Sequence, residues 1–279
     1  MTELTHKEDR LRYLIGELAS VAVAFSGGGD STCLLAVCCE VLGAGRVLAL
    51  TACSPSLPPE ELASARSLAA YLGVSLDVIP TGELNHPAYV RNDEQRCFYC
   101  QHERIAAMWE VVQHRGLATL AFGFTADDDS RERPGIQAAL ERGVRMPLRE
   151  AMLRKDEVRA LALRLGLPTH DKPSLACLAS RIPFGEPITA EALTQVAQAE
   201  AWLRQEVGLP QVRVRSYHRG TMARLEVETD AIVQVAQQEV RERIVARLRA
   251  LGFVYVTLDL AGFRSGSMHE GRAAVGGNR

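Results

Sequence analysis

A run of three glycines between two apolar segments constrains this chain more than any other feature of its sequence. Residues 21–25 are continuously apolar, as in a buried strand, and residues 33–42 are apolar with the length of a helix. Consecutive glycines let the backbone approach a ligand without Cβ clashes, and the amides at a helix start attract anions. The segment therefore predicts a pyrophosphate-binding loop made of Ser26, Gly27, Gly28, Gly29, Asp30, Ser31 and Thr32.

The first half of the chain alternates strand-like and helix-like segments, which predicts an α/β fold with a parallel sheet covered by helices. We expect strands at 21–25, 47–51, 75–79 and 119–123. We expect helices at 7–19, 31–42, 59–72 and 97–115, and the glycines that follow three of them, Gly43, Gly73 and Gly116, are plausible stops.

The second half of the chain changes its pattern. A polar loop after residue 125 leads into short helical segments at 134–142 and 155–165. Beyond residue 190 the order is helix, two strands, a long helix and a strand, at 190–207, 211–216, 223–228, 232–251 and 254–258. We therefore predict an α/β domain over 1–186, a smaller α+β domain over 187–270 and a disordered tail over 271–279.

Charge and hydropathy favour a small-molecule substrate over a nucleic acid. The net charge is −2 and the pI is about 6.4, so there is no basic excess for binding a polyanion. No apolar run approaches the roughly 20 residues of a membrane span, and residues 1–10 are too polar for a signal peptide. We expect a cytoplasmic protein without a membrane partner.

The glycine loop differs from the other common nucleotide motifs. It lacks the Gly-Lys-Ser/Thr of a Walker loop and the spaced glycines of a dinucleotide fingerprint. A flexible turn is the alternative, and the flanking strand and helix weigh against it. Asp30 is unusual in a phosphate cradle, and we expect it to orient an amide or to help to hold Mg²⁺ beside ATP.

With this strand, loop and helix, the chain resembles the PP-loop ATP pyrophosphatase superfamily. The resemblance implies an adenine nucleotide α-hydrolase-like fold for the first domain. It also implies an enzyme that cleaves ATP to AMP and pyrophosphate and transfers the adenylyl group to a carbonyl or carboxylate oxygen before amination or thiolation.

Three further segments, 127–135, 172–189 and 258–268, make almost the whole chain resemble the LarE family. Members of that family are sulfur insertases that build the nickel-pincer nucleotide cofactor of lactate racemase. The resemblance implies adenylylation of a carboxylate of pyridinium-3,5-biscarboxylic acid mononucleotide and attack by sulfur to release a thiocarboxylate. Two rounds would give the bis-thiocarboxylate.

Three cysteines are candidates for sulfur delivery. Cys177, in Ala-Cys-Leu-Ala-Ser-Arg, matches the sulfur-donating cysteine of the family, and Cys97 and Cys100 open a predicted helix two residues apart. In family members with three cysteines, these residues hold three irons of a 4Fe-4S cluster and the fourth iron binds a sulfide. Sacrificial use of Cys177, which leaves dehydroalanine, and a zinc site are the alternatives. Packing is the better account of the other four cysteines, Cys33, Cys38, Cys39 and Cys53.

Charged side chains complete the predicted sites. Asp127 and Asp128 follow a strand end, where open parallel sheets bind ligands, so they are assigned to the ATP site, with a solvated cap as the alternative. Arg213 and Arg215 alternate along a strand and face the same way, as a substrate with carboxylates and a phosphate requires, although exposed strand arginines fit as well. Ser180, Arg181 and Arg264 are further substrate-site candidates, the two arginines by resemblance, and Arg181 is also a catalytic candidate. Glu200 and Asp230 could coordinate a metal or substrate, although a helix face and a strand-end cap explain them equally well.

Rival functions share parts of this pattern. A transfer-RNA thiolase combines the loop with a four-iron cluster, but the acidic pI argues against it. An amidating enzyme of the NAD synthetase type is a second alternative, but its reaction does not require the three cysteines. An iron-sulfur carrier without enzymatic activity is a third, but it does not explain the glycine loop. We expect a homo-oligomer that receives sulfide from a separate loading protein.

Overall fold

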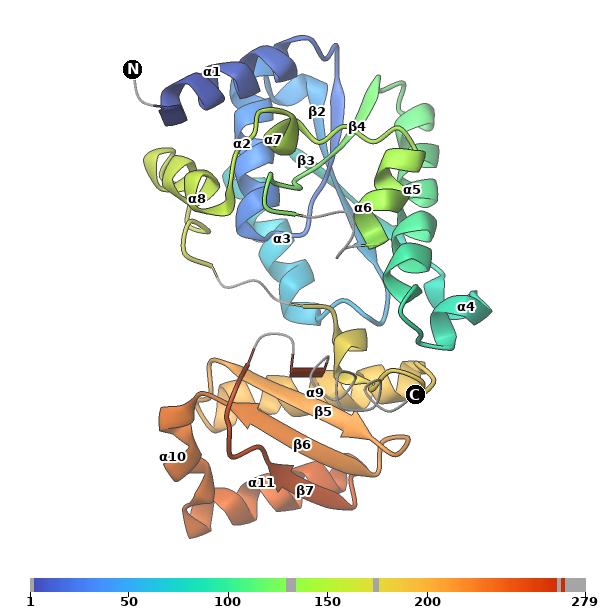
Figure 1. Ribbon diagram of the computed structural model, residues 1–279, viewed down its shortest axis with the longest axis vertical. Coiled ribbons are helices and arrows are strands. Elements are labelled where there is room, and N and C mark those ends of the chain that lie inside the picture. The colour runs from blue at the N-terminus through green and yellow to red at the C-terminus, as the bar shows by residue number, and fades with distance from the viewer. Residues whose placement is uncertain (1–2, 129–133, 173–175, 265–266, 269–279) are drawn as a thin grey trace, which may run out of the picture. The chain divides into compact units, whose positions relative to one another are not determined.

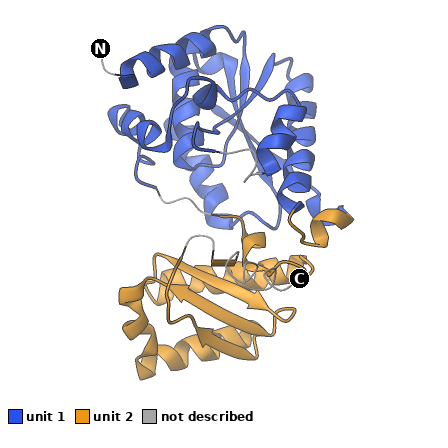
Figure 2. Cartoon of the chain, viewed as in Figure 1, with its two compact units in different colours: residues 1–86, 95–175 blue, residues 87–94, 176–279 orange. Residues whose placement is uncertain are grey.

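The computed structural model describes residues 3–128, 134–172, 176–264 and 267–268. The chain divides into two compact units (Figure 2). The first comprises residues 1–86 and 95–175, and the second comprises residues 87–94 and 176–279. The predicted tail, 271–279, lies outside the described residues.

The first unit is built on a four-stranded parallel sheet with the order β3-β2-β1-β4 (Figure 1). Val21 lies in register with Val47 on one side and Thr119 on the other. The central strand β1 is buried on both faces, which explains its unbroken apolar sequence. The strands are β1 (Val21–Ala24), β2 (Val47–Cys53), β3 (Ser75–Pro80) and β4 (Thr119–Phe122).

Helices cover both faces of this sheet (Figure 1). One core joins Leu11 of α1 to side chains of α2, α3 and α8, and the other joins Ile105 of α5 to Ile136 of α6. Each such leucine or isoleucine contributes roughly 1.5–3 kcal/mol by its burial. The helices are α1 (Glu3–Gly16), α2 (Gly29–Leu42), α3 (Pro59–Tyr71), α5 (Arg96–His114), α6 (Pro134–Glu141), α7 (Pro147–Glu150) and α8 (Lys155–Arg164).

These elements confirm the predicted α/β fold. The largest shift is at α1, which begins four residues before the predicted residue 7. The three predicted stop glycines adopt φ angles of +80°, +65° and +65°, which side chains with a Cβ rarely adopt. Helix termination was therefore readable from the glycine positions.

The second unit is an α+β structure with a three-stranded sheet in the order β5-β6-β7. β5 and β6 form an antiparallel hairpin, and β7 pairs with β6 in parallel. Its elements are α4 (Pro87–Val90), α9 (Ala190–Glu206), β5 (Val212–Tyr217), β6 (Met222–Val227), α10 (Ile232–Ala236), α11 (Gln238–Ala250) and β7 (Tyr255–Leu258). Across the described residues of both units, no helix has the length and apolar character needed to cross a membrane.

Two features of the second unit differ from the prediction. The prediction of a single helix at 232–251 is wrong. Gln237 has a non-helical backbone, with ψ 139°, and separates α10 from α11. The unit also starts at residue 176 and takes in residues 87–94, whereas the prediction placed the boundary at 187. The Asn92 amide explains this addition, because it donates hydrogen bonds to the carbonyls of Pro183 (2.7 Å) and Glu186 (2.9 Å).

Gly123, which follows β4, lies against the backbone of the first turn of α2. A Cβ at this position would stand 3.0 Å from the amide nitrogen of Ser31 and 3.1 Å from the carbonyl carbon of Asp30. Backbone atoms of a packed helix cannot move aside as a flexible side chain can. Glycine is therefore required here to keep β4 close to the start of α2.

We predict that Gly123→Ala lowers the free energy of unfolding by about 1–3 kcal/mol, because the added methyl group pushes α2 away from β4. Gly45→Ala is the matched control, since a Cβ there would have no atom within 4 Å. Its effect should stay within roughly 0.5 kcal/mol. Chemical denaturation measures both, and equal stabilities of the two variants would contradict the prediction.

Candidate functional site

The glycine loop is a turn that hydroxyl groups hold in shape. Gly27 has a φ of +71°, and a Cβ there would be 3.3 Å from the backbone of Ala65. The Thr32 hydroxyl donates to the carbonyl of Gly28 (2.8 Å), and the Ser26 and Ser31 hydroxyls are 3.1 Å apart. Thr32 and Ser31 therefore fasten the loop, in addition to any contact that they make with a ligand.

The start of α2 provides the anion-binding character of this loop. The residue that caps the helix is Gly28, whose side chain is a hydrogen atom and can accept no bond from the first-turn amides. These amides carry the positive end of the helix dipole. Asp30 is half-buried in the same first turn. The arrangement suits a phosphate group accompanied by a cation.

Lys172 lies at this loop, although no role was predicted for it from the sequence. Its Nζ lies 3.0 Å from the carbonyl oxygen of Gly27, 3.0 Å from Oε2 of Glu61 and 3.2 Å from the hydroxyl of Ser64. A positive charge is thus held against the loop by a carboxylate. The only sequence signal was that Lys172 opens the 172–189 segment.

The acidic residues after β4 are engaged in the local structure. Oδ2 of the buried Asp128 accepts hydrogen bonds from the amide and the hydroxyl of Thr125, at 2.9 and 3.1 Å. Asp127 is exposed, and its Oδ2 accepts from the backbone amide of Lys155 (2.7 Å), the first residue of α8. These contacts hold the loop and the start of α8, and a role in ATP binding stays a prediction.

A buried group of charges lies in the second unit. Arg181 and Glu200, each 1% exposed, form a two-point ion pair with N–O distances of 2.7 and 3.0 Å. Glu200 also accepts from Nη2 of Arg204 (2.7 Å) and from the amide of Val214 (3.0 Å). Both oxygens of Glu200 are thus occupied, so this residue positions Arg181 and is poorly placed to coordinate a metal or substrate itself.

Arg215 is held in a second buried pair. Its Nη2 lies 2.8 Å from Oε2 of Glu226 and 2.9 Å from the hydroxyl of Ser267, and its Nη1 donates to the carbonyl of Ser180 (2.9 Å). Glu226 also pairs with Arg224 at 3.0 Å. Glu226 and Arg224 were not among the predicted site residues, although they alternate with Leu225 on β6 as Arg213 and Arg215 alternate on β5.

Arg213 differs from its neighbours because, among the described residues, it makes no hydrogen bond or ion pair. Its guanidinium carbon lies 4.4 Å from the centre of the Phe263 ring. Burial, followed by the charges of Arg181 and Arg215, lowers the pKa of Arg213 to about 10. Since Arg213 is only 9% exposed, the alternative of an exposed strand arginine is wrong. A buried cation with no carboxylate partner of its own among the described residues is suited to binding an anion, and this role stays a prediction.

The remaining substrate-site candidates lie around these charges or on the surface. The Ser180 hydroxyl accepts from Nη1 of Arg181 (2.9 Å). Arg264 donates to the carbonyl of Gly262 (3.0 Å) and lies 3.5 Å from Oδ1 of Asp259. Asp230 is exposed in the turn that follows β6.

The three candidate sulfur-site cysteines are divided between the units. Cys97 and Cys100 lie in the first turn of α5 in the first unit, and Cys177 precedes the turn Leu178–Arg181 in the second. Cys97 and Cys177 are exposed. All seven cysteines are described and none forms a disulfide, so thiol ligands are present for an iron-sulfur cluster. In the described part of the chain, no three His, Cys, Asp or Glu side chains are gathered as a metal site.

Cys33, Cys38 and Cys39 are packed in the core of the first unit, as predicted, whereas Cys53 is half-buried at the end of β2. Burial raises the pKa of Cys33 to about 12, with a smaller contribution from Asp30, and raises that of Cys39 to about 11. Cys38 is fully buried and its pKa is raised further by the same cause. Thiols that stay protonated at neutral pH are poor nucleophiles and ligands.

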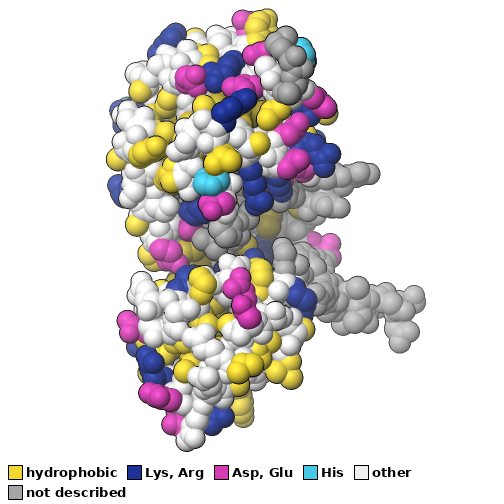
Figure 3. Space-filling model, turned by 90° about the vertical axis from the view of Figure 1, so that its left-hand side faces the viewer, with side chains coloured by type: hydrophobic (Ala, Val, Ile, Leu, Met, Phe, Trp, Pro, Cys, Tyr) yellow, Lys and Arg dark blue, Asp and Glu magenta, His cyan; other side chains and the backbone are white. Residues whose placement is uncertain are grey.

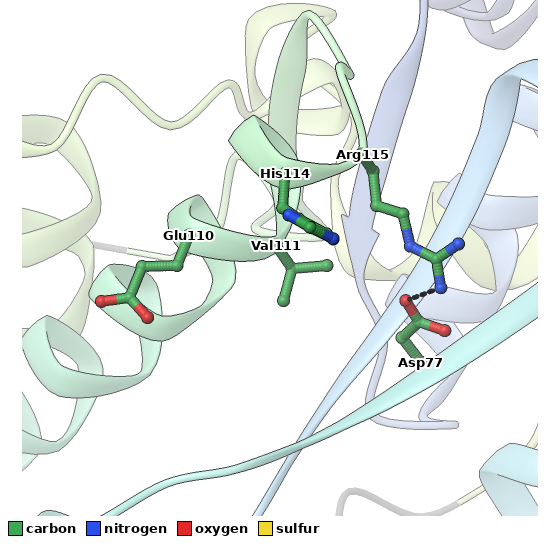
Figure 4. Close-up of a pocket in the computed structure, with 5 residues that line it drawn as sticks. All are labelled: Asp77, Glu110, Val111, His114 and Arg115. Carbon is green, nitrogen blue, oxygen red and sulfur yellow. Dashed lines mark hydrogen bonds and ion pairs between the residues drawn. The ribbon is translucent and has the colours of Figure 1, made fainter.

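Surface features away from these residues are less informative. On the face shown in Figure 3, acidic and basic side chains are interspersed, with no field of a single sign. Figure 4 shows a hollow beside the C-terminal end of α5, where Arg115 pairs with Asp77 of β3 at 2.7 Å and Glu110, Val111 and His114 complete the lining. β3 is an edge strand and β2 separates it from β1, which the glycine loop follows, and no residue of the loop, all of which the structure describes, lines this hollow.

Several known proteins are similar to this chain over most of its length. No family model matches the chain. The chain is 36% identical to pyridinium-3,5-bisthiocarboxylic acid mononucleotide synthase of Lactiplantibacillus plantarum. The two sequences align over 270 residues, which are 97% of this chain and 96% of that protein. It is 42% identical over 267 residues, 96% of this chain and 98% of the relative, to an uncharacterised protein of Synechocystis. An uncharacterised protein of Methanocaldococcus jannaschii is 24% identical over 245 residues, 88% of this chain and 91% of the relative.

We predict that Arg213→Met stabilises the protein without ligand and abolishes its response to anions. Because the pKa of Arg213 is lowered, its charged form opposes folding at neutral pH, and its removal should raise the free energy of unfolding by about 1 kcal/mol. Inorganic phosphate should raise the Tm of the parent protein and leave that of the variant unchanged.

The exposed Arg247 of α11 provides the matched control, because Arg247→Gln removes the same charge from solvent. This variant should keep the phosphate response and the parent stability. A phosphate response that survives in Arg213→Met would show that the buried arginines do not form an anion site.

Proposed function

Because this chain belongs to the family of the pyridinium-3,5-bisthiocarboxylic acid mononucleotide synthases, we propose that it is an ATP-dependent sulfurtransferase. In this proposal it activates the carboxylates of pyridinium-3,5-biscarboxylic acid mononucleotide as acyl-adenylates and converts them to thiocarboxylates. The product is the sulfur-bearing precursor of a nickel-pincer cofactor.

The observation that carries the proposal is that the Arg181 side chain contacts the backbone next to a candidate sulfur residue and also lies beside the buried Arg213. Nη1 of Arg181 donates to the carbonyl of Ala176 (2.9 Å) and lies 3.4 Å from that of Cys177. The same guanidinium lies close enough to Arg213 to lower its pKa. A substrate whose phosphate or carboxylate neutralises Arg213 would therefore be bound beside the segment that presents the Cys177 thiol.

The first unit would supply the activation step. The start of α2 would bind the phosphates of ATP with Mg²⁺, for which Asp30 is the nearest candidate ligand, and Lys172 adds a positive charge at the loop. A substrate carboxylate oxygen would attack the α-phosphorus, and pyrophosphate would leave. Sulfur would then attack the acyl carbon, the bond to the AMP oxygen would break, and AMP would leave with that oxygen.

Cys97, Cys100 and Cys177 are the proposed ligands of a 4Fe-4S cluster, and such a cluster would supply sulfide from the iron that no cysteine binds. These three cysteines form no disulfide, and two of them are exposed. Their thiols are therefore suitable ligands for the irons of such a cluster. Sulfide loading by another protein, a cytoplasmic location and a homo-oligomeric assembly belong to the same proposal.

Sacrificial use of Cys177 is the second candidate, and its exposed thiol favours it. In that case the thiolate attacks the acyl-adenylate, and elimination breaks the bond between Cβ and sulfur. The chain then loses the elements of hydrogen sulfide for each thiocarboxylate formed and turns over once.

We predict that ATP is converted to AMP and pyrophosphate only when the biscarboxylate mononucleotide is present. Lys172→Ala should weaken this activity by roughly tenfold or more, because a charged contact to phosphate is worth about 1.5–3 kcal/mol. Lys7→Ala is the control, since Lys7 pairs with Glu157 on the side of α1. The amount of AMP formed is measured by chromatography. If no AMP forms with any carboxylate substrate, the proposed adenylylation step is wrong.

We predict that the protein purified without oxygen contains about four irons per chain and absorbs near roughly 400 nm. Serine substitution of Cys97, Cys100 or Cys177 should each remove the iron, whereas Cys38→Ser should keep it. An iron-free protein after reconstitution that loses the mass of hydrogen sulfide during the reaction would instead establish sacrificial Cys177.

A further inference from the structure

A second polar cluster lies in the first unit, beyond the carboxyl ends of β2 and β3. Glu83 is 1% exposed, and its Oε1 accepts hydrogen bonds from the hydroxyls of Ser54 (2.5 Å) and Ser56 (3.1 Å). The two serine hydroxyls are themselves 2.8 Å apart. None of these residues belongs to the glycine loop or to the cysteine and arginine groups described above.

This cluster has unused hydrogen-bonding capacity. Oε2 of Glu83 is buried and has no hydrogen-bond partner among the described residues, and the same holds for the hydroxyl of Thr81. A buried carboxylate oxygen without a partner costs about 1–3 kcal/mol or more, so such an atom marks a place where a partner is expected. Ser54 and Thr81 are half-buried, so the cluster borders the protein surface, while Oε2 of Glu83 itself is enclosed.

The cluster lies on the same edge of the sheet as the glycine loop. β1 and β2 are parallel neighbours, and the amide of Phe25 donates to the carbonyl of Leu50 (2.7 Å) just before the loop. Ser54 follows the last residue of β2, and adjacent strands are separated by about 4.8 Å. A nucleotide whose phosphates occupy the loop after β1 would thus extend its sugar over the end of β2.

The chemistry of the cluster matches a sugar diol. A carboxylate oxygen accepts from a ribose hydroxyl, and a serine hydroxyl can both accept and donate. In doubly wound α/β sheets, an acidic residue beyond a neighbouring strand recognises the ribose while the first loop holds the phosphates. A divalent cation is the weaker match, because only one carboxylate is present among the hydroxyls.

We propose that Glu83, Ser54 and Ser56 form the ribose subsite of the nucleotide bound at the glycine loop. Oε2 of Glu83 accepts a hydrogen bond from one ribose hydroxyl, and Ser54 bonds to the other. This inference rests on the proposed function, since it requires ATP at the loop. It makes the cluster the part of the site that distinguishes ribonucleotides from deoxyribonucleotides.

Binding of ATP, 2′-deoxy-ATP and 3′-deoxy-ATP to the full-length protein with Mg²⁺, measured by calorimetry, tests the proposal. The parent protein should bind ATP on the order of tenfold more tightly than at least one deoxy analogue, the loss expected for one charged hydrogen bond. In Glu83→Gln and Ser54→Ala this ratio should fall towards one, mainly because ATP binds more weakly. Ser67→Ala, an exposed serine of α3, should keep the parent ratio.

The outcomes separate this inference from the proposed function. Binding of ATP and both analogues with equal affinity by the parent protein would overturn the ribose subsite and leave ATP binding intact. Equal weakening of all three nucleotides in the variants would assign the cluster a purely structural role, with an internal water on Oε2. No binding of any nucleotide would overturn both. If Glu83→Gln fails to fold, Ser54→Ala decides, because its side chain is half-exposed.

Discussion

The buried ion pair between Arg181 and Glu200 is the interaction on which the second unit depends. It joins the turn after Cys177 to α9, and through the bond from the Val214 amide it also fixes β5. Taking two charges out of water is costly, and removal of one partner from such a pair typically costs about 3–5 kcal/mol. A unit with this arrangement gives up stability to keep charged groups inside, and Arg213 is a buried cation that this arrangement does not pair with a carboxylate among the described residues.

The alternation of apolar segments made the first unit predictable from sequence. Parallel strands are buried on both faces, so β1 is apolar throughout, and a positive φ restricts helix ends to glycine at Gly43 and Gly116. The break at Gln237 was not predictable in the same way. Gln237 has ψ 139° between the two helices, yet glutamine is a good helix former, so the residue itself carries no stop signal.

The candidate sites were predictable to different extents. The glycine loop was found because its backbone needs residues without Cβ, and Arg213 and Arg215 because a strand has a period of two. Lys172 and Glu83 could not be found, since their roles come from contacts between separate segments of the chain. Lys172, for example, reaches Gly27 across 145 residues. Glu226 could have been found from the same alternation, because it lies in the strand paired with that of Arg215. The nucleotide role assigned to Asp127 and Asp128 rested on their position alone, and the structure shows each of them bonded within its own loop or to α8.

The hydrogen bonds of Asn92 to Pro183 and Glu186 have a consequence for dissecting the protein. Because residues 87–94 belong with 176–279, the polypeptide passes between the units three times, and neither unit is one uninterrupted stretch of sequence. A fragment cut at residue 175 would therefore leave the second unit without its α4 segment and the first unit with a foreign insertion. Independent folding of either unit would require a linker in place of 87–94 in the first and a linker in place of 95–175 in the second.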